Sequence, residues 1–285
     1  MSVLWDSLQS TTFRWAVVEA VLVGAIGGVV GVHVMLRRLP FFVVAMSHAM
    51  FPGVVLASVL GISLFLGGTT FGLVVVAGVA AIGASRVLDQ SSAIGVVLAG
   101  AFAFGVLVLS AQPGSSRDLS AFLVGSIVTV TPGDVATTII GGGLVLVVLA
   151  AVHKELVASA FDPAVSAALG YPVRRLDIVV LTAVTVTMAT TIPATGTLLS
   201  VALLTVPALT ARLWTNRVGP MMAVAAGVGA ASGLLGLAAS TLWRIAAGGA
   251  IGLAAGALFA VSLAITSLFA TTAGVGVRRR VRQVA

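Results

Sequence analysis

One histidine, His48, lies about a third of the way along an apolar stretch of the chain. Neutral imidazole is a common ligand for zinc, manganese and iron, so a histidine at this depth could bind a transported metal ion. Met46 and Met50 each stand two residues away, roughly 200° around a helix from the imidazole. A joint methionine–histidine site for copper or haem is therefore not expected, and both methionines should pack in the core. His48 is the candidate metal ligand and transport-path residue.

Three other ionisable side chains fall inside apolar stretches, where a charge is costly and usually faces a cavity or a partner. Glu19 stands near the start of its stretch, which predicts a solvated carboxylate at the membrane surface. His33 and Asp177 stand near the cytoplasmic ends of theirs, and Asp177 is expected to pair with Arg174 or to cap its helix. None of the three is predicted to line a pathway.

Catalytic chemistry is not expected from this chain. It has no G-x-x-x-x-G-K-[ST] loop to cradle phosphates, and its single lysine, Lys154, is followed by Glu155. Cysteine is absent, which removes disulfides, thiolate metal sites and thiol nucleophiles. Serine, histidine and aspartate show no spacing typical of a hydrolase. We expect no enzyme and no bound cofactor, so that any ATP and magnesium would bind a separate ATPase subunit.

The elements that must position these residues are membrane helices. Of the 285 residues, 59% are hydrophobic and 8% charged, whereas soluble domains carry roughly a quarter charged residues. The sequence predicts one all-α polytopic permease domain over residues 1–285, with 33 glycines that favour tight helix packing in a bundle, as at Gly24 to Gly28 and at Gly227 and Gly229. About nine apolar segments approach the length of a bilayer crossing: 15–36, 42–60, 62–84, 92–111, 134–152, 176–192, 195–213, 218–239 and 248–270.

The basic residues predict the orientation of the bundle. If Arg37 and Arg38 lie in the cytoplasm, alternation of nine spans places twelve of the fifteen basic residues on that side. Only Arg14, Arg117 and Arg244 then fall outside. The N-terminus is expected outside and the C-terminus, with a basic tail over residues 276–285, in the cytoplasm. Because the net charge of +7 is spread over the ends of apolar segments, membrane topology explains it and nucleic-acid binding is not expected.

A polar cytoplasmic loop over residues 153–175 contains a short helix signature. Asp162 can cap the N-terminus, Pro163 suits the first helical position, and Gly170 can end the helix in the left-handed conformation. About two turns of helix between two membrane spans can be an ordinary capped connector. They can also be a rigid part that passes force from a cytoplasmic motor to the bundle.

This loop resembles the ATPase-docking loop of permeases in the bacterial ABC importers for zinc, manganese and iron. The resemblance is carried by Lys154-Glu155-Leu156, then Phe161-Asp162-Pro163, Ala167 and Gly170. It implies a fold like that of type II ABC importers and a location in the bacterial cytoplasmic (inner) membrane. It also implies the partners: a cytoplasmic ABC ATPase dimer, a second permease copy and an extracytoplasmic solute-binding protein. The ATPase-coupling residues would be Glu155, Phe161, Asp162, Pro163, Ala167 and Gly170.

Other segments agree with the same family in order along the chain. They are Leu36-Arg37-Arg38, Ser47-His48-Ala49, Pro52-Gly53, Ala93-Ile94-Gly95, Gly125-Ser126, Gly196 with Leu198-Leu199, Pro207-Ala208 and Ala211-Arg212. Proline inside a membrane helix frees a backbone carbonyl, and broken helices often line transport paths. Pro207 is therefore a candidate path residue, whereas Pro193 can equally be a packing kink.

Two positions depart from the family and leave the cargo open. The family usually has an aspartate four residues before the histidine, on the same helical face, and this chain has Val44. Arg244, in the outer loop where the family tends to be acidic, would repel a bare divalent cation at an entrance. The expected function is import of zinc, manganese or iron; a chelated metal, haem or another solute is the alternative cargo. A secondary transporter would need a deeply buried carboxylate pair, and a non-transporting membrane anchor would leave the cytoplasmic loop without a role.

Overall fold

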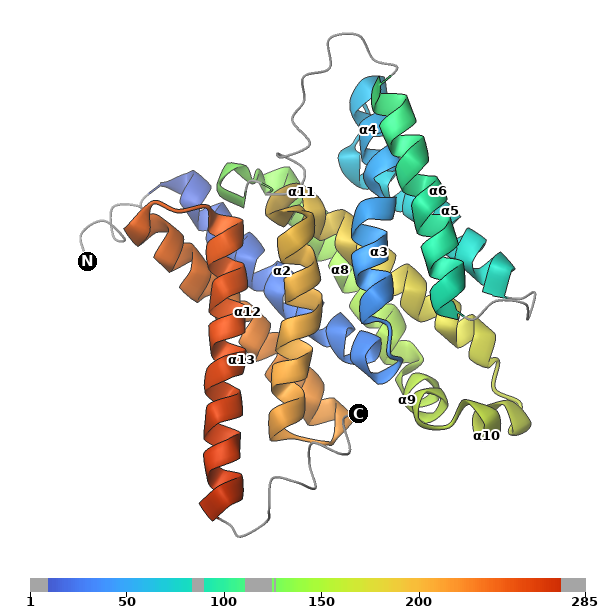
Figure 1. Cartoon of the computed structure of the whole chain (residues 1–285). Helices are drawn as coiled ribbons and strands as arrows, with labels where there is room; N and C mark the ends of the chain where they lie inside the picture. The colour runs from blue at the N-terminus through green and yellow to red at the C-terminus, as the bar shows by residue number, and fades with distance from the viewer. Residues whose placement is uncertain (1–9, 84–89, 111–124, 126, 273–285) are drawn as a thin grey trace.

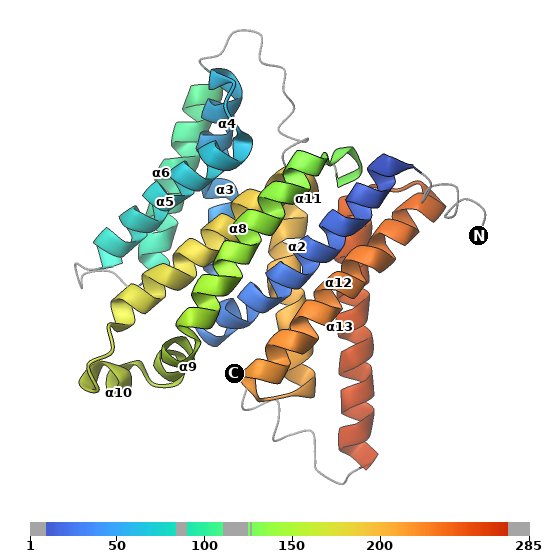
Figure 2. The same cartoon turned by 180° about the vertical axis from the view of Figure 1, so that it is seen from behind.

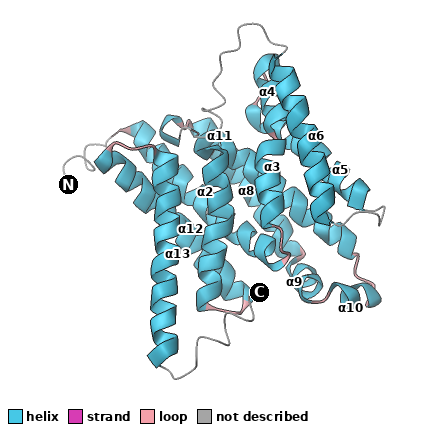
Figure 3. Cartoon of the chain, viewed as in Figure 1, coloured by secondary structure: helices cyan, strands magenta, loops and turns pink. Residues whose placement is uncertain are grey.

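The computed structural model describes residues 10–83, 90–110, 125 and 127–272, and within them the chain is helical with no strand (Figures 1 and 3). The predicted basic tail, Arg86, Arg117 and Ser126 lie outside these residues. The elements are α2 (Thr11–Leu36), α3 (Pro40–Ala49), α4 (Phe51–Leu60), α5 (Leu64–Gly83), α6 (Gln90–Ser110), η1 (Ile127–Thr129), α8 (Pro132–Ala151), α9 (His153–Phe161), α10 (Pro163–Ala168), α11 (Val173–Trp214), α12 (Val218–Trp243) and α13 (Ala247–Thr272).

Eight described helices are long and apolar enough to cross a membrane, with α3 and α4 together forming one of them. The all-α polytopic fold predicted from the sequence is therefore confirmed. One helix, α11, has 42 residues and would extend about 63 Å if straight, twice the thickness of a hydrocarbon core. The helix does not run straight, because Gly196 interrupts it with φ 77° and ψ 169°.

The two halves of α11 run in opposite directions. Figures 1 and 2 show the yellow first half rising from the end of the bundle that carries α10, and the gold second half descending again. These halves, residues 173–195 and 197–214, correspond to the two predicted segments 176–192 and 195–213. The sequence placed their junction at Pro193, but the reversal occurs three residues later. Gly196 fits because its φ lies in a region that side chains rarely adopt.

Local sequence signals explain several helix ends. Thr131 and Asp134 form a reciprocal capping box at the start of α8, and Pro132 occupies the first turn. Ser10 caps α2 by accepting the N–H of Phe13 at 3.1 Å. Gly61 ends α4 in the left-handed conformation, at φ 68°, between the predicted segments 42–60 and 62–84.

Helix α2 packs against α12 and the second half of α11 at very short range. A Cβ added at Gly24 would stand 2.2 Å from the carbonyl oxygen of Gly229, and one at Gly31 would stand 1.9 Å from that of Leu204. The predicted tight packing at Gly24 and Gly229 is therefore confirmed, whereas a Cβ at Gly227 would meet nothing within 4 Å. Small residues let the backbones approach where lipid gives no hydrophobic drive.

The bundle has two distinct ends (Figure 1). The end of α2, the helices α9 and α10, and the connection from α11 to α12 lie at one end. The start of α2, the connection from α4 to α5, and the connection from α12 to α13 lie at the other. The first end carries Arg37 and Arg38 beside Lys154 and Arg174, so the positive-inside rule favours it as the cytoplasmic end. We call it the inner end below.

Candidate functional site

The loop predicted over residues 153–175 forms two short helices at the inner end. Asp162 ends α9 and caps α10, where its side chain accepts the N–H of Val165 at 2.9 Å. Pro163 is the first residue of α10, and Gly170 follows it at φ 88°. The N–H groups of Gly170 and Tyr171 donate to Ala167 and Ser166, each at 3.0 Å, which closes the end. The predicted capped helix is present, while α9 before it was not predicted.

Helices α9 and α10 have one buried and one free face. Leu156, Ser159 and Ser166 are buried against the bundle. Phe161, Val165 and Leu169 are exposed by 66%, 53% and 72% of their surface. These three side chains, with Tyr171 beside them, form what we call the inner apolar face. Exposed apolar side chains grouped at a polar end of the bundle are typical of a surface that binds a partner.

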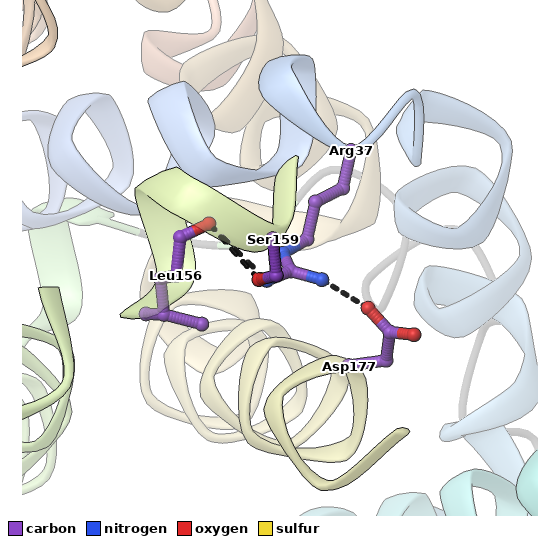
Figure 4. Close-up of polar contacts among 4 residues, drawn as sticks. All are labelled: Arg37, Leu156, Ser159 and Asp177. Carbon is purple, nitrogen blue, oxygen red and sulfur yellow. Dashed lines mark hydrogen bonds and ion pairs between the residues drawn. The ribbon is translucent and has the colours of Figure 1, made fainter. Parts of the chain in front are cut away.

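Arg37 connects this pair of helices to two membrane helices (Figure 4). It follows the last residue of α2 and forms an ion pair with Asp177 of α11. Its other terminal nitrogen donates to the hydroxyl of Ser159 at 2.7 Å and to the carbonyl of Leu156 at 3.3 Å, both in α9. The Arg37 side chain is 6% exposed. Burial lowers the pKa of Arg37, and the charge of Asp177 counteracts this.

The expected partners of Asp177 were wrong. It neither pairs with Arg174 nor caps α11, because Arg174 points elsewhere and donates to the carbonyl of Ala80 at 2.9 Å. Sequence proximity favoured Arg174, but α2 brings the guanidinium of Arg37 to the carboxylate from 140 positions away. The motif Leu36-Arg37-Arg38 was the available signal, since a basic residue at a helix end can reach a neighbouring loop.

A second contact joins α2 to α9 nearby. The rings of His33 and His153 meet edge to face, with centroids 6.1 Å apart. His33 is 2% exposed. Sequence reasoning placed His33 near the inner end of its helix, and it missed His153 as its partner because only the fold brings α9 back to α2.

His48 lies in α3 with its ring edge-on to Phe102 of α6, at a centroid distance of 6.3 Å. Phe41 and Val44 precede it on the same helical face, and both are more than 40% exposed. Met46 and Met50 are fully buried in the largest core cluster, as predicted. The face of α3 that carries Phe41, Val44 and His48 is thus accessible in a single chain, and we call it the α3 face.

The expectation for Glu19 was wrong. The side chain is 0% exposed, and its carboxyl accepts a hydrogen bond from Thr138 of α8 at 2.7 Å. Its second oxygen has no hydrogen-bond partner among the described residues. Distance from the start of a helix did not give its depth, because α8 and α11 cover this part of α2.

A cavity of about 290 Å³ opens at the outer end of the bundle. Ser63, Asp134 and Thr190 line it together with Pro193, beside the reversal of α11. Arg244, the predicted entrance residue, is exposed in the connection from α12 to α13 and does not line this cavity. Pro207, the predicted path residue, is buried in the second half of α11.

The polar side chains that meet beside the reversal of α11 are the hydroxyls of Thr191, Thr195 and Ser200. The hydroxyl of Ser200 accepts a hydrogen bond from Thr191 at 3.1 Å and shares another with the hydroxyl of Thr195 at 3.0 Å. No three side chains of His, Asp or Glu lie together as a metal-binding group within the described part of the chain. A metal ion at His48 would therefore need further ligands from water or from another chain.

Comparison with known proteins extends over nearly the whole sequence. The model of the ABC 3 transport family matches residues 9–266. The chain is 32% identical over 263 residues to the manganese transport system membrane protein MntC of Halalkalibacterium halodurans, covering 92% of this chain and 90% of that protein. It is 33% identical over 250 residues to the manganese import system permease protein ScaB of Streptococcus gordonii, covering 88% and 90%. Among solved structures it is similar to PsaBC from Streptococcus pneumoniae in complex with Fab, with a TM-score of 0.82, 30% identity and coverage of 92% and 94%.

Proposed function

Because the chain belongs to the ABC 3 transport family, we propose that it is the membrane permease of an importer that carries manganese across the bacterial cytoplasmic membrane. It is a permease of the metal-importing kind, and it is a multi-pass membrane protein. Manganese is the cargo named for the relatives, and it comes to this chain by that similarity. The observation that supports the mechanism is the inner apolar face, to which an ATPase subunit can bind.

ATP hydrolysis would occur in a separate ABC ATPase dimer that docks on α9 and α10. Phe161, Val165 and Leu169 would enter the ATPase surface, while Asp162 and Pro163 fix the direction of α10. Glu155, Ala167 and Gly170 complete the predicted coupling set, and Gly170 ends the helix at a positive φ. When the ATPase subunits close and reopen, α10 would move with them and switch the bundle between outward-open and inward-open states.

The transport path would form between two copies of this chain. The α3 face is exposed in one chain, and its apolar side chains support burial against a second copy. His48 from each copy would then face a shared path, so that a pair of imidazoles takes the place of a pocket within one chain. An extracytoplasmic solute-binding protein would deliver the ion to the outer end, near the cavity lined by Asp134.

The cargo is a transition-metal ion rather than a chelate, as the named relatives support. Val44 and Arg244 remain the features that would suit a chelated metal. Uptake assays with free manganese, free zinc and an iron chelate separate the two cargoes. We expect free manganese to be transported, and transport of only the chelate would contradict the proposal.

Docking is tested by one substitution on the inner apolar face and one at the cap that fixes α10 beside it. Phe161→Ala removes the exposed ring, and Asp162→Arg removes the cap and reverses a charge. We expect both to lower co-purification with the ATPase and to abolish ATP-driven uptake, because the partner loses its apolar anchor.

The matched control is Trp214→Ala, which removes a 52% exposed aromatic side chain at the end of α11. We expect it to leave the ATPase bound. If Phe161→Ala and Asp162→Arg also leave the complex and its uptake intact, the ATPase does not dock on this face.

A further inference from the structure

We propose that Arg37 transmits the movement of α9 and α10 to α2 and α11, and so determines how much transport each ATP drives. The inference rests on the proposed function, in which the ATPase binds the inner apolar face of α9 and α10. It adds the residue through which these two helices would move the membrane helices. Arg37 is a positioning residue, because it would act through the helices that it joins and touches no cargo.

The guanidinium of Arg37 is shared by three elements. It belongs to the end of α2, pairs with Asp177 in the first turns of α11, and donates to Ser159 and Leu156 in α9 (Figure 4). A planar guanidinium can hold partners on two sides at once, whereas a lysine ammonium offers one point charge. The side chain is 6% exposed, so water does not compete strongly for these bonds.

Helices α9 and α10 expose one set of side chains and bury another. Phe161, Val165 and Leu169 point away from the bundle, while Leu156 and Ser159 are buried against it. The two groups that Arg37 binds in α9 are those of Leu156 and Ser159. A push on the inner apolar face would therefore reach the guanidinium through one short helix. The ring contact between His33 and His153 braces α9 against α2 at a second point.

The two membrane helices that Arg37 joins, α11 and α2, connect the inner end to the rest of the bundle. The half of α11 that begins near Asp177 ends at Gly196, next to the outer cavity lined by Thr190 and Pro193. Helix α2 passes through the bundle in backbone contact with α12 at Gly24 and with the second half of α11 at Gly31. Because packed cores shift as units, a displacement at the inner end is carried along both helices.

The central experiment measures manganese taken up per ATP hydrolysed in proteoliposomes that contain the chain with its ATPase. Arg37→Lys keeps the positive charge but replaces the planar guanidinium, which can bond to partners on two sides, by a single ammonium group. We expect the ATPase to co-purify as before, while uptake per ATP falls about tenfold, the factor that corresponds to losing one charge-assisted hydrogen bond.

The matched control is Arg174→Lys. Arg174 lies at the same end, at the start of α11, and its exposed guanidinium makes one bond to the carbonyl of Ala80. We expect uptake per ATP to stay at the level of the parent protein. An unchanged ratio in Arg37→Lys, or an equal fall in both variants, would overturn the role of Arg37.

A double variant addresses the case in which Arg37→Lys fails to fold. Arg37→Met with Asp177→Leu removes both members of the ion pair, so that neither charge is left unpaired. The double variant should assemble with the ATPase and hydrolyse ATP, but uptake should lag behind hydrolysis. Normal uptake per ATP in this variant would contradict the proposal.

A chemical rescue separates transmission from simple stabilisation. The chain has no cysteine, so Arg37→Cys with Ser159→Cys creates a single reactive pair. A bifunctional thiol reagent with the reach of an arginine side chain, applied before the ATPase is added, should restore uptake per ATP. A cross-linked protein that stays uncoupled would show that a direct link between α9 and α2 does not transmit the movement, and would contradict the proposal.

The proposed function and this inference fail in different ways. If Phe161→Ala leaves the ATPase bound and active in transport, the docking face is wrong. If Phe161→Ala releases the ATPase and Arg37→Lys keeps full uptake per ATP, the docking face stands and the role of Arg37 is wrong.

Discussion

Single polar side chains decide how this apolar bundle could handle an ion. His48 is accessible on the α3 face, and Val44 stands one turn before it without a carboxylate. Glu19 is buried against Thr138, away from that face. The chain therefore leaves an imidazole accessible at its surface and keeps the carboxyl of Glu19 buried.

The first prediction concerns His48. His48→Ala should lower manganese uptake while ATPase binding stays unchanged, because the imidazole is the only described metal-binding side chain on the α3 face. Radioactive manganese uptake into cells or proteoliposomes measures the effect. Ser47→Ala, a neighbouring change at a buried hydroxyl that bonds to the carbonyl of Val44, is the control and should transport normally.

The second prediction concerns Val44. Val44→Asp places a carboxylate one helical turn before His48, and both side chains then share a face. We expect tighter binding of free manganese, measured by isothermal titration on the assembled complex, since oxygen and imidazole ligands together suit this ion. Unchanged affinity in Val44→Asp would show that the α3 face does not meet the ion.

The third prediction concerns the hydrogen bond between Thr138 and Glu19. Thr138→Val removes the donor and leaves a buried carboxyl without its partner, which should cost about 1–3 kcal/mol of stability. The melting temperature in detergent should fall. Glu19→Leu combined with Thr138→Val should recover most of the loss, because removing both partners leaves no polar group unsatisfied. A double variant less stable than Thr138→Val would indicate another role for the carboxyl.

Residue types were predictable here, and residue partners were not. The core positions of Met46 and Met50 followed from helical spacing relative to His48. The burial of Glu19 and the pairing of Asp177 with Arg37 did not follow, because each depends on a helix more than a hundred positions away.

At the scale of elements, several helix ends could be predicted from local sequence signals. Asp162, Pro163 and Gly170 predicted α10 correctly because each signal is local to the chain. Helix α9 was missed, since His153–Phe161 spans too few turns to show a clear apolar period and is held by Arg37 from outside. The break in α11 was predicted at Pro193, and it occurs at Gly196, three residues later, because proline gave the stronger breaking signal in the sequence.

The fourth prediction compares two glycines on α12. A Cβ at Gly229 would stand 2.0 Å from the carbonyl oxygen of Gly24, whereas a Cβ at Gly227 would meet nothing within 4 Å. Gly229→Ala should therefore push α12 from α2 and lower the melting temperature. Gly227→Ala should leave it unchanged or raise it slightly, because alanine favours helix. Equal melting temperatures would show that α2 and α12 do not pack this closely.

At the scale of the whole molecule, the two ends of the bundle carry different features. The inner end gathers basic residues, the inner apolar face and the Arg37 junction, while the outer end holds the cavity beside the reversal of α11. Apolar segments predicted the helical bundle, because the length of a span follows from the bilayer itself. The orientation that the basic residues indicate stays a prediction. The cavity could not be predicted, since α5, α8 and α11 meet there only in the folded chain.

The most direct measurement is manganese accumulation in proteoliposomes that contain the chain and its ATPase, with ATP and magnesium inside and the solute-binding protein outside. We predict accumulation with ATP, none with a non-hydrolysable analogue, and no loss when the proton gradient is collapsed. Accumulation that needs no ATP and stops with the proton gradient would contradict an ATP-driven permease and identify a secondary transporter.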